Sequence, residues 1–312
     1  MTEQPLAAAE SEPHGVYAAA LTPVDDDLAP DCARLVRHCR WLLDNGCNGL
    51  AVLGTTGEAN SFSVDERLQI LDALGEAGFT GAELIPGTGC CALPDSVRLT
   101  RRAIEIGAAG VLMLPPFYIK NVSDDGLFAS YAEIIERVGD DRLRVYLYHF
   151  PQMSATPLSH GLIERLLKAY PLTVAGIKDS SGDLDNMTAM ARNFPALRVF
   201  SGTERFLAPM LKAGGVGCIS AGANVLSTPT GRLYDQWRGE TDEAEIDRMQ
   251  EEVTRLRLML EGFPMIAAMK AMVARHTGDD AWANVRPPLV KLAPGVVSNL
   301  LKTVDQAGLV LP

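Results

Sequence analysis

A lysine that could act as a nucleophile stands at the end of a short apolar run. Lys178 follows Val174-Ala175-Gly176-Ile177, so its side chain is expected to leave a buried strand and enter an enclosed pocket. Desolvation disfavours a charged ammonium, and a free amine can attack a carbonyl carbon to form an imine. The alternative is a structural lysine that forms an ion pair with Asp179 or Asp183. The position of Lys178 favours imine chemistry on a carbonyl substrate.

Hydroxyl groups and accessible backbone amides follow other apolar runs. Tyr148 could transfer protons near an imine, although a single buried tyrosine is more often a packing residue. The segment Gly54-Thr55-Thr56-Gly57-Glu58 offers glycines that allow close approach, together with amides and hydroxyls that could bind a carboxylate. The alternative for this segment is a tight turn whose threonines cap the next helix.

Motifs for other chemistries are missing from the sequence. Gly87-Thr88-Gly89 is too short for a dinucleotide-binding fingerprint, and the pattern Gly-x-x-x-x-Gly-Lys-Ser/Thr does not occur. None of the five histidines lies at ligand spacing from a cysteine, so no metal site is expected. His149 should point to the opposite face of its strand from Tyr148, which favours a structural role. We therefore expect chemistry by side chains alone, with no cofactor.

Short β-rich runs alternate with longer segments of helical periodicity along most of the chain. Several runs are continuously apolar, as in strands covered on both faces. Eight strand–helix units in series predict a closed parallel (β/α)8 barrel, or TIM barrel, in which catalytic residues stand at the C-terminal ends of strands. The expected strands are Val16–Leu21, Gly49–Leu53, Glu83–Pro86, Gly110–Leu114, Val145–Phe150, Val174–Ile177, Val199–Ser201 and Gly215–Ser220. The expected helices of the first half are Cys32–Asn45, Asp65–Ala77, Ser96–Ile106, Leu127–Val138 and Leu158–Ala169, with Asp31, Ser63, Ser96 and Ser159 as candidate N-caps.

The helical pattern changes in the last quarter of the chain. Three helical segments follow one another without a convincing strand between them, which predicts a C-terminal helical appendage. These segments are Ala244–Glu261, Met265–Thr277 and Ser298–Gln306. The expected division is a mobile N-terminal tail over residues 1–14, a barrel over residues 15–238 and a helical region packed on the barrel over residues 239–312.

Composition excludes several classes of protein. With 47% hydrophobic and 21% charged residues, the chain can bury a large core. The formal net charge of -11 and the lack of a Lys/Arg-rich stripe argue against nucleic-acid binding. Apolar runs are too short to span a membrane, and the N-terminus does not resemble a secretory signal. The six cysteines show no Cys-x-x-Cys pairing, which favours reduced thiols in a cytoplasmic protein.

The ordered set of motifs resembles the dihydrodipicolinate synthase/N-acetylneuraminate lyase family. Each motif is modestly specific alone, whereas the ordered set is highly specific, and the resemblance extends from about Gly15 to about Leu301. It implies a class I, Schiff-base-forming lyase that acts on pyruvate or a related 2-oxo acid. The motifs are Gly54-Thr55-Thr56-Gly57-Glu58, Tyr148-x-x-Pro151, Gly176-Ile177-Lys178-Asp179, Ser201-Gly202, residues 214–225 and Arg286-Pro287-Pro288-Leu289.

The resemblance also implies roles for individual residues. Lys178 would form the imine and Tyr148 would transfer protons. Thr55 would link Tyr148 to Tyr118, which in this family enters the site from a neighbouring subunit of a homotetramer built as two tight dimers. Thr56 would hold the carboxylate of pyruvate. Further family positions around the pocket are Gly202, Ile219 and Asn224.

The sequence departs from one branch of the family at the specificity pocket. Synthases of the lysine precursor carry an arginine two residues after the proline of Tyr-x-x-Pro, and this chain has Met153 there. Methionine cannot replace a bidentate arginine contact to the carboxylate of aspartate semialdehyde. Ser180, Thr203 and Glu204 occupy places that face the hydroxylated tail in the sugar-acid lyases of the family. The alternative for Glu204 is an exposed loop carboxylate paired with Arg205, which otherwise could turn inward as a basic group.

We therefore predict reversible cleavage of a carbon–carbon bond. A 2-keto-3-deoxy sugar acid would bind Lys178 as a protonated imine, and Tyr148 would remove the proton of the C4 hydroxyl. Breaking of the C3–C4 bond would release an aldehyde and leave the enamine of pyruvate. The alternatives are a 4-hydroxy-tetrahydrodipicolinate synthase or a dehydratase that uses the same imine. An alternative from another class is a non-catalytic barrel that binds a 2-oxo acid.

Overall fold

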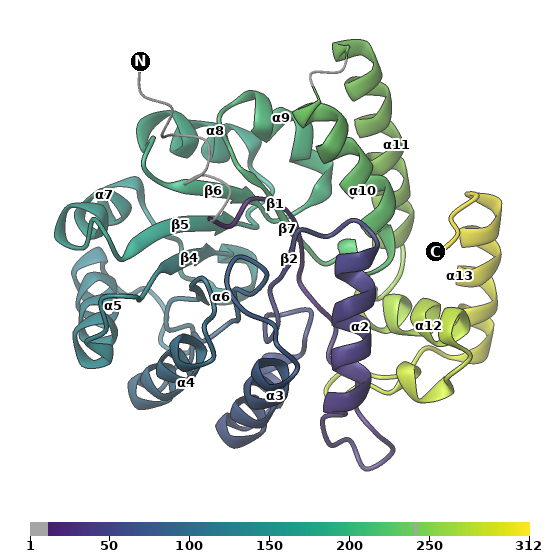
Figure 1. Ribbon diagram of the computed structural model, residues 1–312, viewed down its shortest axis with the longest axis horizontal. Helices are drawn as coiled ribbons and strands as arrows, with labels where there is room; N and C mark the ends of the chain where they lie inside the picture. Colours follow the sequence, from purple (N-terminus) through teal and green to yellow (C-terminus); the bar gives the residue numbers. More distant parts are fainter. Residues whose placement is uncertain (1–11, 240–241) are drawn as a thin grey trace.

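Seven short parallel strands curl around the centre of the computed structural model, which describes residues 12–239 and 242–312 (Figure 1). Residues 1–11, most of the predicted N-terminal tail, lie outside the described part. The strands lie side by side in the order β2-β1-β7-β6-β5-β4-β3. Their bounds are β1 (Gly15–Ala18), β2 (Gly49–Leu50), β3 (Val111–Met113), β4 (Val145–His149), β5 (Val174–Asp179), β6 (Arg198–Ser201) and β7 (Gly217–Ser220).

An extended segment between β2 and β3 closes this sheet into a barrel. Ile85 N donates to Leu50 O at 2.9 Å, and Leu112 N donates to Pro86 O at 2.8 Å. The segment takes the place of the expected third strand, Glu83–Pro86, but forms only isolated parallel bridges. Pro86 has no N–H to donate, and this interrupts a regular ladder. The closed parallel arrangement confirms the predicted (β/α)8 barrel.

Helices surround the barrel on its outer face (Figure 1). Asp31, Ser63 and Ser159 cap their helices as predicted, each by accepting a hydrogen bond from a backbone N–H of the first turn. The helices of the barrel are α2 (Cys32–Asp44), α3 (Val64–Glu76), α4 (Leu93–Glu105), α5 (Asp124–Val138), α6 (Pro151–Ser154), α7 (His160–Ala169), α8 (Leu184–Asn193), α9 (Leu207–Lys212) and α10 (Ala223–Arg238), with the 3-10 turns η1 (Ala59–Ser61) and η2 (Glu204–Phe206).

The predicted N-cap Ser96 is wrong. Helix α4 begins at Leu93, and Pro94 occupies its first turn, where its fixed φ angle favours helix initiation. Ser96 therefore lies inside the helix, and its hydroxyl accepts a hydrogen bond from Cys90 N at 2.9 Å. The sequence contains both signals, and the proline sets the start of the helix.

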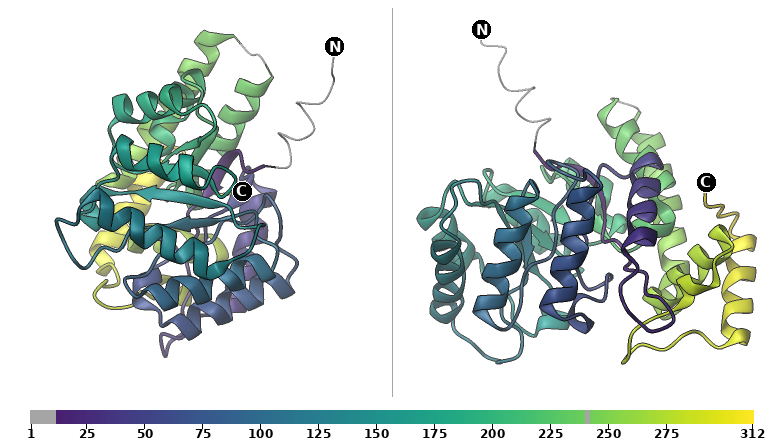
Figure 2. Two further views of the ribbon diagram at one scale, coloured as in Figure 1. Left: turned by 90° about the vertical axis from the view of Figure 1, so that its left-hand side faces the viewer. Right: turned by 60° about the horizontal axis from the view of Figure 1, so that its bottom comes forward.

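Three helices after the barrel pack against one side of it, next to α2 and α10 (Figures 1 and 2). They are α11 (Glu243–Glu261), α12 (Met265–Thr277) and α13 (Pro294–Gln306), with the 3-10 turn η3 (Asp280–Ala283). Leu21 and Leu226 of the barrel share one buried apolar cluster with Leu256, Met269 and Leu300. From this packing we propose the division into a barrel (15–238) and a helical region (239–312). No helix in the described ranges has the length and apolar character needed to cross a membrane.

A buried ion pair ties the C-terminal helices to the loop after β2. Lys270 of α12 is fully buried and donates to Glu58, the last residue of the Gly54–Glu58 segment, and to Asn284 O at 2.8 Å. Glu58 also accepts a hydrogen bond from Arg286 N at 2.8 Å. Burial lowers the pKa of Lys270, and the Glu58 carboxylate opposes that shift. Glu58 therefore links this loop to the helical region.

Large side chains fill the interior of the barrel. Phe200 packs edge-on against Tyr17 and Tyr146, with ring centroids 5.6 and 6.0 Å apart. Ile219 and Tyr148 belong to the same buried cluster. The barrel is thus a packed core, and a site can form only at an end of the strands.

Candidate active site

Lys178 lies at the C-terminal end of β5, between two neighbouring strands. It stands opposite Tyr148 of β4 and Phe200 of β6 in the sheet register. The side chain is 5% exposed, and Nζ lies 4.4 Å from the centre of the Tyr148 ring. Two residues earlier, a Cβ on Gly176 would lie 2.4 Å from the Tyr146 ring, so a larger residue would clash there. The strands thus hold the amine against a phenol ring.

The alternative of an ion pair between Lys178 and the nearby aspartates is wrong. The Asp179 carboxylate accepts hydrogen bonds from Ser181 N at 2.7 Å and Asn186 Nδ2 at 2.8 Å. Asp183 caps helix α8. Within the described ranges, Lys178 forms no hydrogen bond or ion pair with either carboxylate, so its amine remains available to a ligand.

His149 lies on the other face of β4, as expected from strand alternation. Its Nδ1 accepts a hydrogen bond from Leu158 N at 3.0 Å. Burial lowers the pKa of His149, and the nearby Asp179 carboxylate opposes that shift. The imidazole therefore supports the loop that leads into α7 and does not face Lys178.

A cavity of about 420 Å³ opens at this end of the barrel. Its volume falls in the range of small-molecule sites. The Gly202 backbone lies so close to Ser180 that an added Cβ would lie 2.1 Å from the Ser180 hydroxyl, so the lack of a side chain keeps this part of the cavity open. The cavity brings together most of the predicted site residues, namely Thr55, Thr56, Tyr148, Lys178, Ser180, Gly202 and Thr203.

A smaller cavity adjoins the first at Thr55 and Tyr148, which line both. Its other walls include Gly87 and Gly89. A Cβ on Gly87 would lie 2.2 Å from Leu53 O, so this glycine serves close backbone packing. The threonine and the phenol therefore face two connected spaces.

Three predicted site residues do not line the main cavity. Ile219 is fully buried in the barrel interior. Tyr118 is 83% exposed on the loop after β3. Glu204 is fully buried behind the cavity wall. Met153, at the position of the missing arginine, is 60% exposed on α6 and also lies outside the lining.

Glu204 is held by a residue that the sequence did not indicate. Its carboxylate accepts hydrogen bonds from Arg257 Nη1 at 3.0 Å and from the Ser220 hydroxyl. A Cβ on Gly222 would lie 1.7 Å from Glu204 Oε1, so the carboxylate fits against a bare backbone. The alternative of an exposed carboxylate paired with Arg205 is therefore wrong.

The C-terminal helices contribute the rest of the cavity wall. Arg257 also donates to Glu261 Oε1 at 3.0 Å, and Arg205 lies 3.4 Å from Glu261 Oε2. Arg205, Arg257 and Glu261 all line the cavity, as do Met265, Ile266 and Met269 of α12. Helical periodicity indicates that α11 and α12 exist, but not which end of the barrel they cover. The sequence signal for this part of the wall is the i,i+4 pair of Arg257 and Glu261. Such pairs are common on exposed helices, so the pair does not point to a cavity.

Other reactive groups do not form a metal centre. In the part of the chain that the structure describes, no group of His, Cys, Asp and Glu side chains is arranged to hold a metal ion. All six cysteines are free thiols. The arrangement of one buried amine, one phenol and several hydroxyls suits chemistry on a carbonyl compound.

Comparisons with known proteins agree with this arrangement. The model of the dihydrodipicolinate synthetase family matches residues 12–307. A DapA-like lyase of Chloroflexus aurantiacus is 34% identical over 291 residues, covering 93% of this chain and 95% of the relative. A 4-hydroxy-tetrahydrodipicolinate synthase of Parasynechococcus marenigrum is 30% identical over 303 residues, covering 96% and 97%. The crystal structure of dihydrodipicolinate synthase from Agrobacterium tumefaciens has a TM-score of 0.85 at 32% identity, covering 94% of this chain and 99% of that one.

The fold and these relatives define a (β/α)8-barrel lyase of the aldolase type. The chain belongs to the dihydrodipicolinate synthetase family. This confirms the family and the reaction class expected from the ordered motifs.

Proposed function

We propose that this enzyme forms an imine between Lys178 and a 2-oxo acid and reversibly cleaves a 2-keto-3-deoxy sugar acid to pyruvate and an aldehyde. The observation that carries the proposal is the 5% exposed amine of Lys178, which is free of the neighbouring carboxylates and lies against Tyr148 at the cavity. An amine held in this way can attack a carbonyl carbon.

The reaction begins with attack of the Lys178 amine on the C2 carbonyl, and loss of water gives a protonated imine. Tyr148 then removes the proton of the C4 hydroxyl as the C3–C4 bond breaks. The bonding electrons pass into the imine, which becomes the enamine of pyruvate, and the aldehyde leaves. Protonation at C3 and hydrolysis release pyruvate and restore the amine.

Thr56 is proposed to hold the carboxylate of the 2-oxo acid. The residue is buried, lines the cavity and belongs to the loop that Glu58 fixes to the helical region. A hydroxyl and a backbone amide held in this way bind an anion without reorganisation. The carboxylate would thus orient the carbonyl carbon toward Lys178.

Tyr118 is proposed to complete the proton relay of a neighbouring subunit through Thr55. Its 83% exposure in a single subunit and the 68% exposure of Ile119 leave an aromatic and an apolar side chain for an interface. The smaller cavity beside Thr55 and Tyr148, of about 20 Å³, has room for the hydroxyl of such a phenol but not for its ring. A homotetramer built from tight dimers accounts for these features.

The far end of the cavity favours a hydroxylated aldehyde. Arg205 and Arg257 stand there, but Glu204 and Glu261 compensate their charges. In a wall whose charges balance, the hydroxyl of Thr203 can hydrogen-bond the hydroxylated tail of a substrate. A carboxylate on the substrate would have to compete with the two glutamates for the arginines. Ser180 supplies a further hydroxyl.

The alternative is the synthase reaction with aspartate semialdehyde. Relatives named as synthases share 30% and 32% identity with this chain, and two arginines line the cavity although Met153 replaces the usual one. The dehydratase would use the same imine. The ion pair between Arg205 and Glu261 is 3.4 Å long. If Arg205 left this pair, its guanidinium would supply the cation that the carboxylate of aspartate semialdehyde needs.

The ratio of kcat/KM for glyceraldehyde and aspartate semialdehyde, each condensed with pyruvate, separates these reactions. A hydroxyl-recognising site rejects a mismatched analogue by up to about 10⁴-fold. We expect a ratio that favours glyceraldehyde. A ratio that favours aspartate semialdehyde, and falls in Arg205→Gln, would establish the synthase reaction in its place.

The cytoplasm is the proposed location. Six free thiols, several of them buried, are typical of a reducing compartment.

A further inference from the structure

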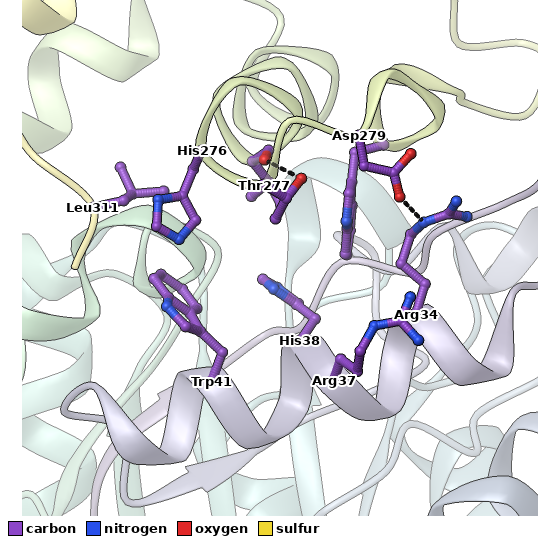
Figure 3. Close-up of a pocket in the computed structure, with 10 residues that line it drawn as sticks. Arg34, Arg37, His38, Trp41, His276, Thr277, Asp279 and Leu311 are labelled. Carbon is purple, nitrogen blue, oxygen red and sulfur yellow. Dashed lines mark hydrogen bonds and ion pairs between the residues drawn. The ribbon is translucent and has the colours of Figure 1, made fainter.

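A second cavity of about 420 Å³ lies between α2 of the barrel and α12 of the helical region (Figure 3). It shares no lining residue with the catalytic cavity. Its walls come from α2, the C-terminal half of α12, η3 and the end of the chain at Leu311. The proposed reaction leaves this space without a role.

Aromatic rings form much of the wall. The rings of His38 and Trp41 lie 5.8 Å apart at 14° to each other, and those of Trp41 and His276 lie 5.4 Å apart. The Trp282 ring meets His38 edge-on at 4.8 Å. Figure 3 shows the Trp41 and His276 rings next to each other at one end of the cavity, with His38 between the two helices. Such walls accept a flat ring by stacking or edge contact.

The protonation of His38 follows from its neighbour Asn224. Asn224 Nδ2 donates to Ala19 O and Ala221 O at 2.8 Å, so its Oδ1 is fixed as the acceptor. That oxygen accepts from Leu21 N at 2.9 Å and lies 3.0 Å from His38 Nε2, which must therefore carry a proton.

The second nitrogen of His38 is then an acceptor. Burial lowers the pKa of His38 to about 4, so the ring is neutral near pH 7 and Nδ1 is unprotonated. Among the described residues, none donates a hydrogen bond to Nδ1. A bound molecule would satisfy this atom only with an N–H or O–H group.

Besides Arg34, a second arginine contributes positive charge at the cavity, where it helps to lower the pKa of Asp279. Arg34 is engaged by Asp31 at 2.6 Å and by Asp279 at 2.7 Å. Arg37, one turn further along α2, also lines the cavity and is exposed. In the described ranges Arg37 makes no hydrogen bond or ion pair. Its guanidinium can form a bidentate pair with a carboxylate.

We propose that this cavity binds a small aromatic carboxylate that carries an N–H or O–H group. The ring packs against Trp41, His276 and Trp282, the donor group bonds to His38 Nδ1, and the carboxylate pairs with Arg37. Because all three contacts lie on α2, α12 and η3, the ligand bridges the barrel and the helical region.

Indole-2-carboxylate is a suitable probe because it combines the three features, and isothermal titration calorimetry measures its affinity. We expect saturable binding with one site per chain and a Kd below about 1 mM, unchanged by saturating pyruvate. The analogue 1-benzofuran-2-carboxylate has the same shape without the N–H donor and should bind about tenfold or more weakly. Indole, which has no carboxylate, should also bind at least about tenfold more weakly.

Arg37→Gln should weaken indole-2-carboxylate binding about tenfold or more, because a charge-assisted contact is lost. Arg232→Gln is the matched control, since Arg232 is also exposed and forms no hydrogen bond or ion pair among the described residues. Unchanged affinity in Arg37→Gln, equal affinity for the benzofuran, displacement by pyruvate, or no saturable binding would each overturn the proposal. These results do not depend on the catalytic activity of the protein.

Discussion

The Nζ atom of Lys178 lies 4.4 Å from the centre of the Tyr148 ring, and the two residues stand opposite each other on adjacent parallel strands. Strands in a closed barrel cannot shift register independently, so the amine and the phenol keep this geometry without a bound ligand. Preorganisation of this kind reduces the reorganisation needed for proton transfer at an imine.

Tyr148→Phe should lower turnover by about 10²–10⁴-fold, the usual range for a positioned acid–base group. The ring would keep its packing against Phe150, whose centroid lies 5.8 Å away, so the fold should be retained. Tyr146→Phe is the matched control, because Tyr146 points the same way from β4 but lies deeper in the barrel. Near-normal turnover of Tyr148→Phe would identify Tyr148 as a packing residue.

Tyr118→Phe should also lower turnover if the phenol serves another subunit. Mixed oligomers of Tyr118→Phe and Lys178→Ala subunits should then regain activity, because one kind of site combines an intact lysine with an intact phenol. The controls are each variant alone and a sample that contains both variants without exchange of subunits. Verified mixed oligomers without regained activity would place Tyr118 outside the relay.

Arg257→Met should lower the free energy of unfolding by about 3 kcal/mol, because it leaves Glu204 buried without its cation. Glu204 Oε1 already lacks a hydrogen-bond partner, and the Ser220 hydroxyl that remains on the carboxylate carries no charge. The double variant with Glu204→Gln should recover part of the loss. Arg205 forms a longer ion pair with Glu261, and both side chains are about a third exposed. Arg205→Met should therefore lower the free energy of unfolding by less than about 1 kcal/mol. Equal losses for both arginines in urea unfolding would contradict the role of the buried pair.

The ion pair between Glu66 and Arg286 should make stability depend on pH in the acid range. The Arg286 guanidinium lowers the pKa of Glu66 from 4.5 to about 2. A carboxyl with a lowered folded-state pKa stabilises the fold above its unfolded pKa and loses that contribution as pH falls. The stability difference between the wild type and Glu66→Gln should therefore shrink between pH 4.5 and about 2.

Glutamine at position 66 can still accept the hydrogen bond from Ser63 N, so the capping box of α3 is retained. Asp65→Asn changes the neighbouring acid, which is 83% exposed, and serves as the control. A stability difference for Glu66→Gln that stays constant with pH would show that the charge of Glu66 is not responsible.

The sequence predicted the residues at the strand ends well. Lys178, Tyr148, Thr55 and Thr56 follow apolar runs directly, and the barrel topology alone brings the ends of its strands together. The five barrel helices for which the sequence analysis gave bounds were also predicted to within a few residues, because their periodicity and caps are local signals.

Contacts that depend on the C-terminal helices could not be predicted. Arg257 reaches Glu204 across 53 residues of chain, and Lys270 reaches Glu58 across 212. Neither distance leaves a local pattern, and an acid in a loop is usually exposed, which is why the pairing of Glu204 was missed. For the same reason, the sequence did not show that α12 forms part of the wall of the catalytic cavity.

Reductive trapping tests the central claim most directly. Incubation with pyruvate and borohydride, followed by peptide mapping by mass spectrometry, should place a reduced three-carbon adduct on Lys178 and inactivate the enzyme. Lys270 is also buried but is ion-paired with Glu58, so it should remain unmodified. Lys178→Ala should lose the adduct and keep its folded spectrum. An adduct on another lysine, or none in the wild-type protein, would contradict imine formation at Lys178.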